Sequence, residues 1–406
     1  MPDLRVLFAT RILRLFAYGL LSVILVLYLA VVGLSASRIG LLLTLTLVGD
    51  TAISLWITTN ADRVGRKRML MLGAGLMIFA GALFALSSSF VPLLVAATIG
   101  VISPSGNEVG PFLAIEQAAL ADQVAAERRT KIFAWYNLVG SAATALGALA
   151  GGGVVQLLQG RGLATLASYR IVVIAYAVLG ALMLGLFTRL SAAAEPPGQA
   201  RGPKRPAFFQ ANLGLDRSRA NVFKLAGLFT MDAFAGGFVV QAFVAYWFHT
   251  RFGVEPALLG GIFFAANILA GISALSANWL AARIGLLQTM VGTHLPSNVL
   301  LVLVPLMPSL PWAMAMLLAR FSISQMDVPT RQAYTMALVA PAERSAAAGV
   351  TGIARTIGAA LAPLAAGPLY ATAALAGIPF FIGGGLKIVY DLLVWRTFRK
   401  VELPKD

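Results

Sequence analysis

The chain has 406 residues, of which 59% are hydrophobic and 12% are charged, with a mean hydropathy of +0.84 and a formal net charge of +15. Soluble globular domains are about one quarter charged, so this composition excludes an ordinary soluble fold. No cysteine is present, which excludes disulfides, thiolate metal sites and a cysteine nucleophile.

Long apolar segments follow one another along the chain. Residues 15–37, 69–107 and 288–319 contain no Asp, Glu, Lys or Arg, and a bilayer core about 30 Å thick needs about 20 apolar residues per helix. We interpret the first segment as an uncleaved helix rather than a signal peptide. The pattern predicts twelve transmembrane helices at 12–33, 39–59, 69–88, 92–122, 132–158, 169–190, 221–247, 257–282, 286–306, 310–339, 346–373 and 376–396.

Lysine and arginine are distributed unevenly between the two sides of these spans. The amino terminus, the loops after even-numbered spans and the carboxyl terminus hold 23 of them, and the opposite loops hold 4. The positive-inside rule therefore places both termini in the cytosol. The basic excess orients the protein in the lipid bilayer and needs no nucleic-acid partner. We expect a multi-pass, monomeric protein of a bacterial-type inner membrane.

A hydrophilic stretch and an internal repeat divide the chain. Residues 191–220 are rich in Pro, Gly and basic residues, which is typical of a linker. FAYGLLSVILVLYL (16–29) aligns with FAGGFVVQAFVAYW (234–247), and EQA (116–118) with RQA (331–333), at offsets between 215 and 220. The sequence therefore predicts an all-α membrane protein of two pseudo-symmetric six-helix bundles, 1–190 and 221–406, joined by a cytosolic linker. This duplicated architecture is typical of secondary transporters.

The loop between spans two and three concentrates charge in the sequence NADRVGRKRML (60–70). It resembles the signature of the major facilitator superfamily, roughly G-x-x-x-D-R-x-G-R-[RK]. The pattern is matched by Asp62, Arg63, Gly65, Arg66 and Lys67, and Thr58 replaces its leading glycine. The resemblance to this architecture covers nearly the whole chain and implies the fold of that superfamily.

The resemblance also implies a mechanical role for this loop. Arg66 would pair with an acid at the inner end of span four, for which Asp122 is the natural candidate. The network would latch the two halves in an outward-open state. In the second half Ala282 stands where Asp62 stands in the first, so the latch would be one-sided. The simpler alternative is a solvated loop that only orients the chain.

Span five contains glycines at helical spacing. GSAATALGALAGG (140–152) partly resembles the antiporter motif G-x-x-x-G-P-x-x-G-G, which Gly147, Gly151 and Gly152 fit. Ala143 and Ala148 replace the first glycine and the proline of that motif. Small residues at this spacing more often serve helix packing. The partial motif is therefore only a hint of export.

Charged residues inside the spans are the candidate functional groups, because a charge at the bilayer centre costs about 2.5–3.5 kcal/mol on insertion scales. Span four carries Glu108 and Glu116, and span ten carries Arg320, Asp327 and Arg331. The resemblance places spans one, four, seven and ten around a central cavity. We expect Glu108 or Glu116 to carry a proton, and Asp327 and Arg331 to contact the substrate. The alternative is a static buried salt bridge.

Other polar residues are weaker candidates. Asp232 aligns with Arg14 in the repeat, which suggests a pair at the cytosolic mouth. Tyr18 and Gln241 could line the cavity. Further intramembrane charges are expected to make contacts between helices: Asp50, Arg355, Lys387 and Asp391. The two histidines, His249 and His294, are isolated, and no Walker A sequence is present, so no metal and no cofactor is expected.

The sequence as a whole predicts a secondary active transporter that moves a small amphiphilic solute by alternating access. Proton-coupled export is the reading we favour. Uptake of an organic anion through Arg331 and Arg320 is the closest alternative, followed by an uncoupled facilitator or a lipid scramblase. No nucleophile, base or metal constellation has usable spacing, so we do not expect an enzyme.

Overall fold

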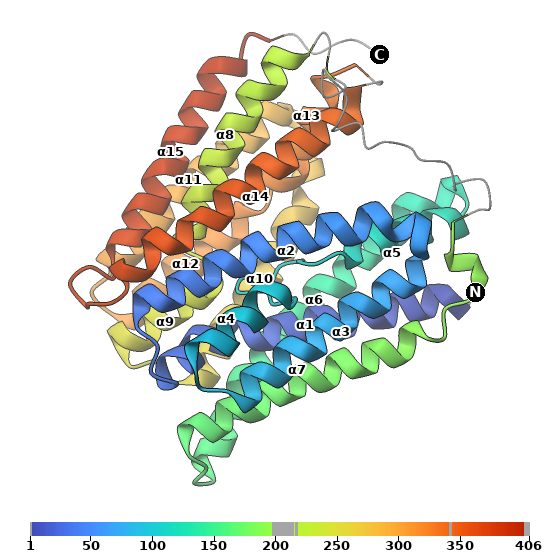
Figure 1. The fold of residues 1–406 in the computed structure, drawn as a ribbon. Coiled ribbons are helices and arrows are strands. Elements are labelled where there is room, and N and C mark those ends of the chain that lie inside the picture. The colour runs from blue at the N-terminus through green and yellow to red at the C-terminus, as the bar shows by residue number, and fades with distance from the viewer. Residues whose placement is uncertain (1, 197–214, 216–217, 341–342, 402–406) are drawn as a thin grey trace. The chain divides into compact units, whose positions relative to one another are not determined.

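A computed structural model describes residues 2–196, 215, 218–340 and 343–401 (Figure 1). Most of the predicted linker, 191–220, lies outside these residues. The described part contains helices and no strand. The α-helices are α1 (Pro2–Val31), α2 (Ala36–Val64), α3 (Arg66–Leu86), α4 (Phe90–Ile99), α5 (Phe112–Gln123), α6 (Ala126–Gly160), α7 (Thr165–Phe187), α8 (Arg219–Gly237), α9 (Gln241–Phe252), α10 (Pro256–Ile284), α11 (Leu286–Leu303), α12 (Leu310–Ser324), α13 (Asp327–Ala337), α14 (Arg344–Leu369) and α15 (Ile378–Phe398).

The predicted spans agree with these helices. Ten segments of the described chain are long and apolar enough to cross a membrane, counting α8 and α9 together as Arg219–Phe252. The other two predicted spans, 92–122 and 310–339, are each divided into two shorter helices. The expected all-α membrane fold is therefore confirmed. In the described chain, nine of the twelve predicted spans correspond to one α-helix each, and three are divided between two: α4 with α5, α8 with α9, and α12 with α13.

The break in span four follows from its glycines and prolines. Helix α4 ends at Ile99, with Gly100 as its C-cap, and α5 begins after Pro111. Between them, Gly106 and Gly110 have φ angles of +72° and +84°, which only glycine adopts freely. Pro104 and Pro111 lack the amide hydrogen that a helix would need. Residues 100–111 therefore form an irregular segment inside a membrane span.

Side chains of neighbouring helices hydrogen-bond the carbonyl groups of this irregular segment. The Tyr18 hydroxyl of α1 donates to the Val109 carbonyl at 3.1 Å, and the Tyr176 hydroxyl of α7 donates to the carbonyl of Val101. The amide of Ala242 donates to the Pro104 carbonyl at 3.1 Å. Non-helical backbone survives at membrane depth only when its polar groups find such partners.

Span ten breaks just before Pro329. Helix α12 ends at Ser324 and α13 begins at Asp327, so the proline lies in the first turn of α13. Proline is tolerated there, but its ring would clash with the carbonyl four residues earlier, that of Gln325. This clash explains why the interruption falls at residues 325–326 rather than at the proline itself.

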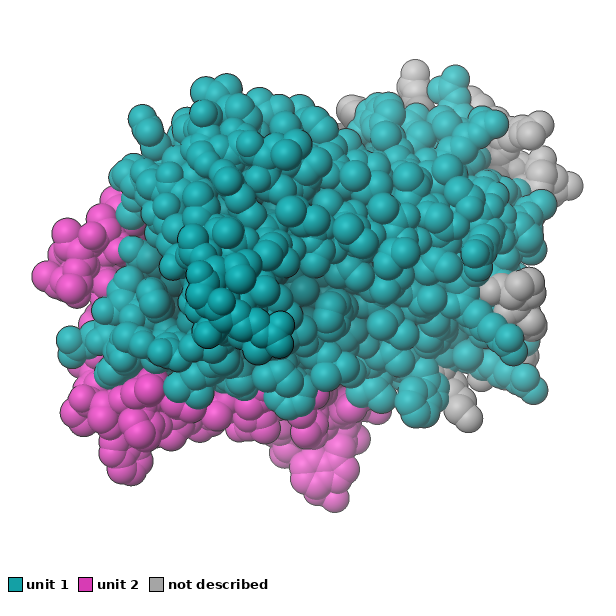
Figure 2. All heavy atoms as spheres, turned by 90° about the horizontal axis from the view of Figure 1, so that it is seen from below, with its two compact units in different colours: residues 1–203, 240–264 teal, residues 204–239, 265–406 magenta. Residues whose placement is uncertain are grey.

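The described chain forms two compact units, coloured separately in Figure 2. Unit 1 comprises Met1–Pro203 and Val240–Phe264, and unit 2 comprises Lys204–Val239 and Ala265–Asp406. In unit 1, α1 packs against α6, α7 and α9 and is the most buried crossing. In unit 2, α8 packs against α14 and α15, and α11 against α12, α13 and α15. The division of the chain into two bundles at 191–220 stays a prediction.

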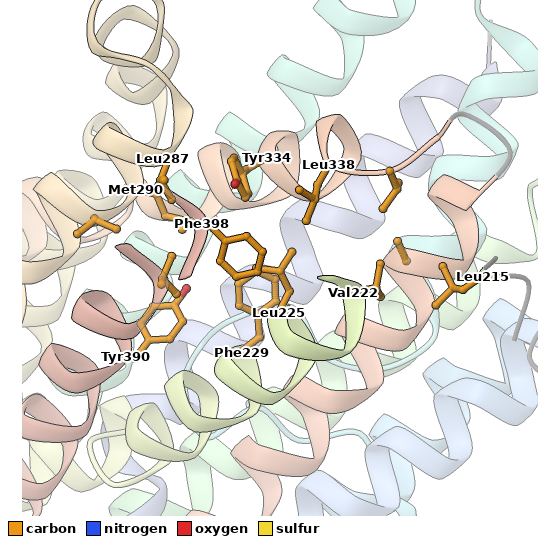
Figure 3. Packing of buried hydrophobic residues seen from close by; sticks show 14 residues of the cluster. Leu215, Val222, Leu225, Phe229, Leu287, Met290, Tyr334, Leu338, Tyr390 and Phe398 are labelled. Atoms are coloured by element: carbon orange, nitrogen blue, oxygen red, sulfur yellow. The ribbon is translucent and has the colours of Figure 1, made fainter. Parts of the chain in front are cut away.

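An apolar core in unit 2 lies beside its charged residues. Phe229 of α8, Tyr334 of α13 and Tyr390 and Phe398 of α15 belong to this core and come together in Figure 3. The ring centroids of Phe229 and Tyr390 lie 6.4 Å apart, and those of Tyr334 and Phe398 lie 6.1 Å apart. Asp232, Arg331 and Lys387, described below, each lie three residues from one of these aromatic residues in the sequence.

Large apolar side chains are also exposed along the crossing helices. They include Leu55, Trp56, Leu275, Trp279 and Trp312, each more than half exposed. A soluble monomer rarely exposes so much contiguous apolar surface, whereas lipid tails solvate it.

Candidate functional site: two buried charge clusters

In unit 1, two arginines of α1 bind two glutamates of span four. Arg14 forms a bidentate salt bridge with Glu116: Nη1 donates to Oε1 at 2.8 Å and Nη2 donates to Oε2 at 2.7 Å. Its Nε donates to Glu108 at 2.8 Å. Arg11 Nη1 donates to the second oxygen of Glu108, also at 2.8 Å. The four side chains carry two positive and two negative charges and form a balanced group.

Glu116 of α5 is the fully enclosed member of this group. Its side chain and that of Arg14 have no exposed surface. In addition to Arg14, Thr10 donates to Oε1 at 3.0 Å and the Tyr136 hydroxyl donates to Oε2. Four donated hydrogen bonds therefore occupy the two oxygens of the carboxylate.

Glu108 differs from Glu116 in its access to the surroundings. It lies in the irregular segment rather than in a helix, and its side chain is 16% exposed. Its described partners are the two guanidinium groups of Arg11 and Arg14. The cluster therefore contains one glutamate with a fully buried side chain, Glu116, and one with a partly exposed side chain, Glu108.

In unit 2, one buried carboxylate gathers three permanent cations. Asp232 of α8 lies 2.5 Å from Lys387 Nζ, 3.2 Å from Arg355 Nη1 and 3.3 Å from Arg331 Nη1. Arg331 also binds Asp327, one turn before it in α13, at 2.7 Å. These five groups hold three positive and two negative charges. Arg355 is the most accessible of them, with 34% of its side chain exposed.

A histidine extends the unit 2 cluster. His294, which the sequence suggested to be isolated, is buried within α11. Its Nδ1 lies 2.8 Å from Asp391, which also accepts a hydrogen bond from Asn298 at 3.0 Å. Its Nε2 lies 3.7 Å from Asp232. His294 thus bridges two carboxylates, a role that no local sequence pattern indicates.

The remaining predicted substrate residues have partners inside their own unit or stand apart. The Gln241 amide donates to Ser22 at 2.8 Å, and Tyr18 bonds the irregular segment as described above. Arg320 lies in α12, and its buried Nε has no hydrogen-bond partner in the described chain. Arg14 and Asp232, which the repeat suggested as a pair, each bind acids or bases of their own unit.

The charged loop at 60–70 forms a network in unit 1. Gly65 links α2 to α3 with a φ of +116°. Arg66 binds Asp122 at 2.6 Å, the contact that the family resemblance implies, and Asp62 at 2.8 Å. Arg63 is exposed. The structure adds Glu195, whose carboxylate accepts hydrogen bonds from the first two amides of α3 at 2.8 and 3.2 Å. A carboxylate is favourable at this end of a helix. The gating role stays a prediction.

The glycines of span five pack α6 against other helices of unit 1. A Cβ atom at Gly147 would collide with the carbonyl of Phe16, and one at Gly151 with the carbonyl of Leu20, both in α1. Gly152 lies equally close to the backbone of Pro256 in α10. These close approaches favour the packing role over a signature of export.

Some of these residues could have been found by using the internal repeat further. The sequence alignment already placed Arg14 opposite Asp232, and Glu116 opposite Arg331. Because each pair joins the first and fourth spans of its own half, the two salt bridges occupy equivalent positions. The repeat gives no such indication for Arg11, Arg355, Lys387 and His294, because their contacts depend on how each helix is rotated about its axis.

Buried charge pairs beside broken helices, within long apolar crossings, define a multi-pass membrane protein of the transporter class. Residues 7–363 match the Major Facilitator Superfamily. The chain belongs to this family of membrane transporters.

Known proteins that resemble the chain agree with this assignment. It is 31% identical to the "Uncharacterized membrane protein YJR124C" of Saccharomyces cerevisiae, over 98% of this chain and 95% of the relative. The nucleoside transporter NupG superposes with a TM-score of 0.76 at 14% identity, covering 99% of this chain and 100% of that chain. A bacterial homologue of the human lysosomal transporter Spinster, inward-facing and occupied, gives 0.70 at 17% identity, covering 98% and 97%. At these identities the two solved structures show the fold alone.

Proposed function

We propose that the chain is a proton-coupled secondary active transporter that moves a small solute by alternating access. The observation that carries the proposal is the balanced group of Arg11, Arg14, Glu108 and Glu116 at the broken span of unit 1. Ion pairs inside a membrane are costly and mark substrate or proton pathways. The solute crosses unchanged, without covalent chemistry.

Within this group, Glu108 is the better proton carrier of the two predicted acids. Glu116 is sealed and accepts four hydrogen bonds, so protonation would break a satisfied network. Glu108 is partly exposed and shares the two arginines. Protonation of Glu108 would weaken its salt bridges with Arg11 and with Nε of Arg14. Because these salt bridges join α1 to span four, the packing between them would change.

The test is proton flux in proteoliposomes that contain a pH-sensitive dye. Tetraphenylphosphonium serves as the amphiphilic cation and benzoate as the organic anion, each added outside. We expect one of them to evoke a pH change that Glu108→Gln abolishes. Glu116→Gln, checked for intact folding, is the matched variant and should retain more of the flux. Labelled solute that crosses without any pH change would show an uncoupled facilitator instead.

Transport of an organic anion is the second candidate, and unit 2 favours it. Three permanent cations surround Asp232, and Asp327 is the only other carboxylate that forms an ion pair with any of them among the described residues. Arg355 is one-third exposed, and its described hydrogen bonding is limited to one nitrogen. A carboxylate or phosphate on the solute would suit the remaining donors. Saturable benzoate uptake that Arg355→Gln weakens would support this reading over the cationic one.

Direction, membrane and assembly complete the proposal. We retain export as the favoured direction, although the packing of Gly147 and Gly151 gives the motif another explanation. A bacterial-type inner membrane with cytosolic termini and a monomeric state are proposed as well. Because the 31% identical relative is a yeast protein, the membrane is best tested directly, by fusing a fluorescent reporter to either terminus.

A further inference from the structure

An acid in the middle of α2 stands apart from every other intramembrane carboxylate of unit 1. Asp50 lies midway along α2, between Ala36 and Val64. Glu108 and Glu116 are bound by arginines, whereas no lysine or arginine in the described part of the chain forms an ion pair with Asp50. An ionised carboxylate without a cation is expensive at the centre of a membrane span. Asp50 must therefore be hydrated or protonated for much of the time.

The contacts of Asp50 tie it to the irregular segment of span four. The backbone amide of Gly110 donates to its carboxylate, and the Ser54 hydroxyl lies 3.4 Å from Oδ1. Gly110 belongs to no helix, so its amide is free to make this bond. Asp50 is partly exposed rather than sealed. It thus connects α2 to the same segment that carries Glu108.

The charged and titratable groups around Asp50 leave it without a compensating positive charge. Glu108 of the irregular segment, Tyr18 of α1 and Tyr176 of α7 lie within electrostatic reach. Helix α4, which packs along α2, contains no titratable residue. The charged residues of α3 are confined to its first turn, and Glu116 and Asp122 of α5 are bound by arginines.

We infer that Asp50 is a proton-binding site of unit 1, additional to Glu108. It takes a proton from water on one side of the membrane as a neutral carboxylic acid, and releases it to the other side when the chain changes conformation. With its proton the acid still accepts from Gly110 through one oxygen and can donate through the other. Its ionisation would place a second negative charge beside Glu108. The inference rests on the proposed proton coupling but names a different residue from the two predicted ones.

Two measurements on the full chain in lipid vesicles test this inference. The first is infrared difference spectroscopy during a pH titration, which reads the C=O stretch of a protonated carboxyl group and needs no solute. We expect a titrating band that Asp50→Asn removes. Asparagine keeps an acceptor for the Gly110 amide and has nearly the same shape, so folding should be preserved. Asp62→Asn, at an exposed acid of the same helix, is the control and should leave the band unchanged.

The second measurement is the solute-evoked proton flux in the dye-loaded vesicles, with tetraphenylphosphonium and benzoate. We expect Asp50→Asn to reduce the flux to that of protein-free vesicles while exchange of labelled solute between the two sides continues. If Asp50→Asn leaves every titrating band of the wild type in place, or leaves the flux intact, the role of Asp50 is overturned, while the wild-type flux would still support proton coupling. If wild-type protein shows no flux, the proposed coupling fails, and the infrared band alone decides whether Asp50 binds a proton.

Discussion

Unit 1 and unit 2 contain the same salt bridge with its charges exchanged. In unit 1 an arginine of α1, Arg14, binds a glutamate of α5, Glu116. In unit 2 an aspartate of α8, Asp232, binds an arginine of α13, Arg331. The internal repeat aligns these positions with each other. The duplication that the internal repeat predicts would account for a buried pair between the first and fourth spans of each half, with its polarity exchanged.

The two salt bridges differ in the charged residues that surround them. In unit 1 the two arginines are matched by two glutamates, and Asp50 remains as an unpaired acid. In unit 2 three permanent cations share Asp232 and Asp327 as ion-pair partners, and His294 joins Asp232 to a further carboxylate, that of Asp391. The comparison shows two buried clusters of different composition among the described residues: the acids of unit 1 include one without a basic partner, whereas three cations of unit 2 share two carboxylates.

The largest expected effect is the loss of the central anion of unit 2. Asp232→Asn would leave Lys387, Arg331 and Arg355 facing one another around a neutral amide. We expect a loss of about 4–5 kcal/mol in the free energy of unfolding, because buried charges without partners are costly. Lys387→Met is the matched variant and should cost only about 1–2 kcal/mol, since Asp232 keeps two arginines. Denaturation in mixed detergent micelles measures both free energies of unfolding. Equal losses would show that Asp232 is no more important to the stability of the cluster than one of its cations.

A somewhat smaller effect is expected when the pair of unit 1 is broken. Arg14→Met leaves the sealed Glu116 with only neutral donors and should destabilise the chain by about 3–4 kcal/mol. Replacing both partners, Arg14→Met with Glu116→Leu, should restore most of this loss, because a buried pair can be exchanged for apolar side chains at little cost. The same unfolding assay applies. A double variant as unstable as the single one would contradict a simple pair.

The smallest expected effect concerns a feature that both halves share. Gly147 lies against the backbone of α1, and Gly358 of α14 lies against the Thr230 carbonyl of α8. Alanine at either position should cost about 1–3 kcal/mol, because the added methyl group meets backbone that cannot move aside. Gly153→Ala and Gly352→Ala are controls, since a Cβ atom there meets nothing within 4 Å. Unequal losses at Gly147 and Gly358 would show that the helix packing, like the charge pairs, has diverged between the halves.

Much of the fold could be predicted from the sequence because lipid imposes a simple rule on it. Long uncharged segments indicate crossings directly, and Pro104, Pro111 and Pro329 marked two of the three spans that break. The break between α8 and α9 at 238–240 was not predicted. It follows the Gly236–Gly237 pair, and glycine pairs do not always interrupt a helix.

The candidate site was predictable only in part. Glu108, Glu116, Asp327 and Arg331 were identified because charge is rare inside an apolar span. Their partners were not, since the sequence shows which helix carries a charge but not toward which neighbour it turns. Arg14 and Asp232 were assigned to each other because they align in the repeat, whereas alignment marks equivalent positions rather than contacts. His294 was missed because its partner Asp391 lies 97 residues away along the chain.

The exchanged polarity of the two salt bridges has a consequence for how the halves diverged after duplication. A single substitution that reversed one charge of an ancestral pair would have buried two like charges side by side. Each pair today has a second partner that softens such a step: Glu108 beside Arg14, and Asp327 beside Arg331. With that carboxylate in place, the acid of the pair could have been replaced first while the arginine kept a partner, whereas replacing the arginine first would have left two carboxylates side by side.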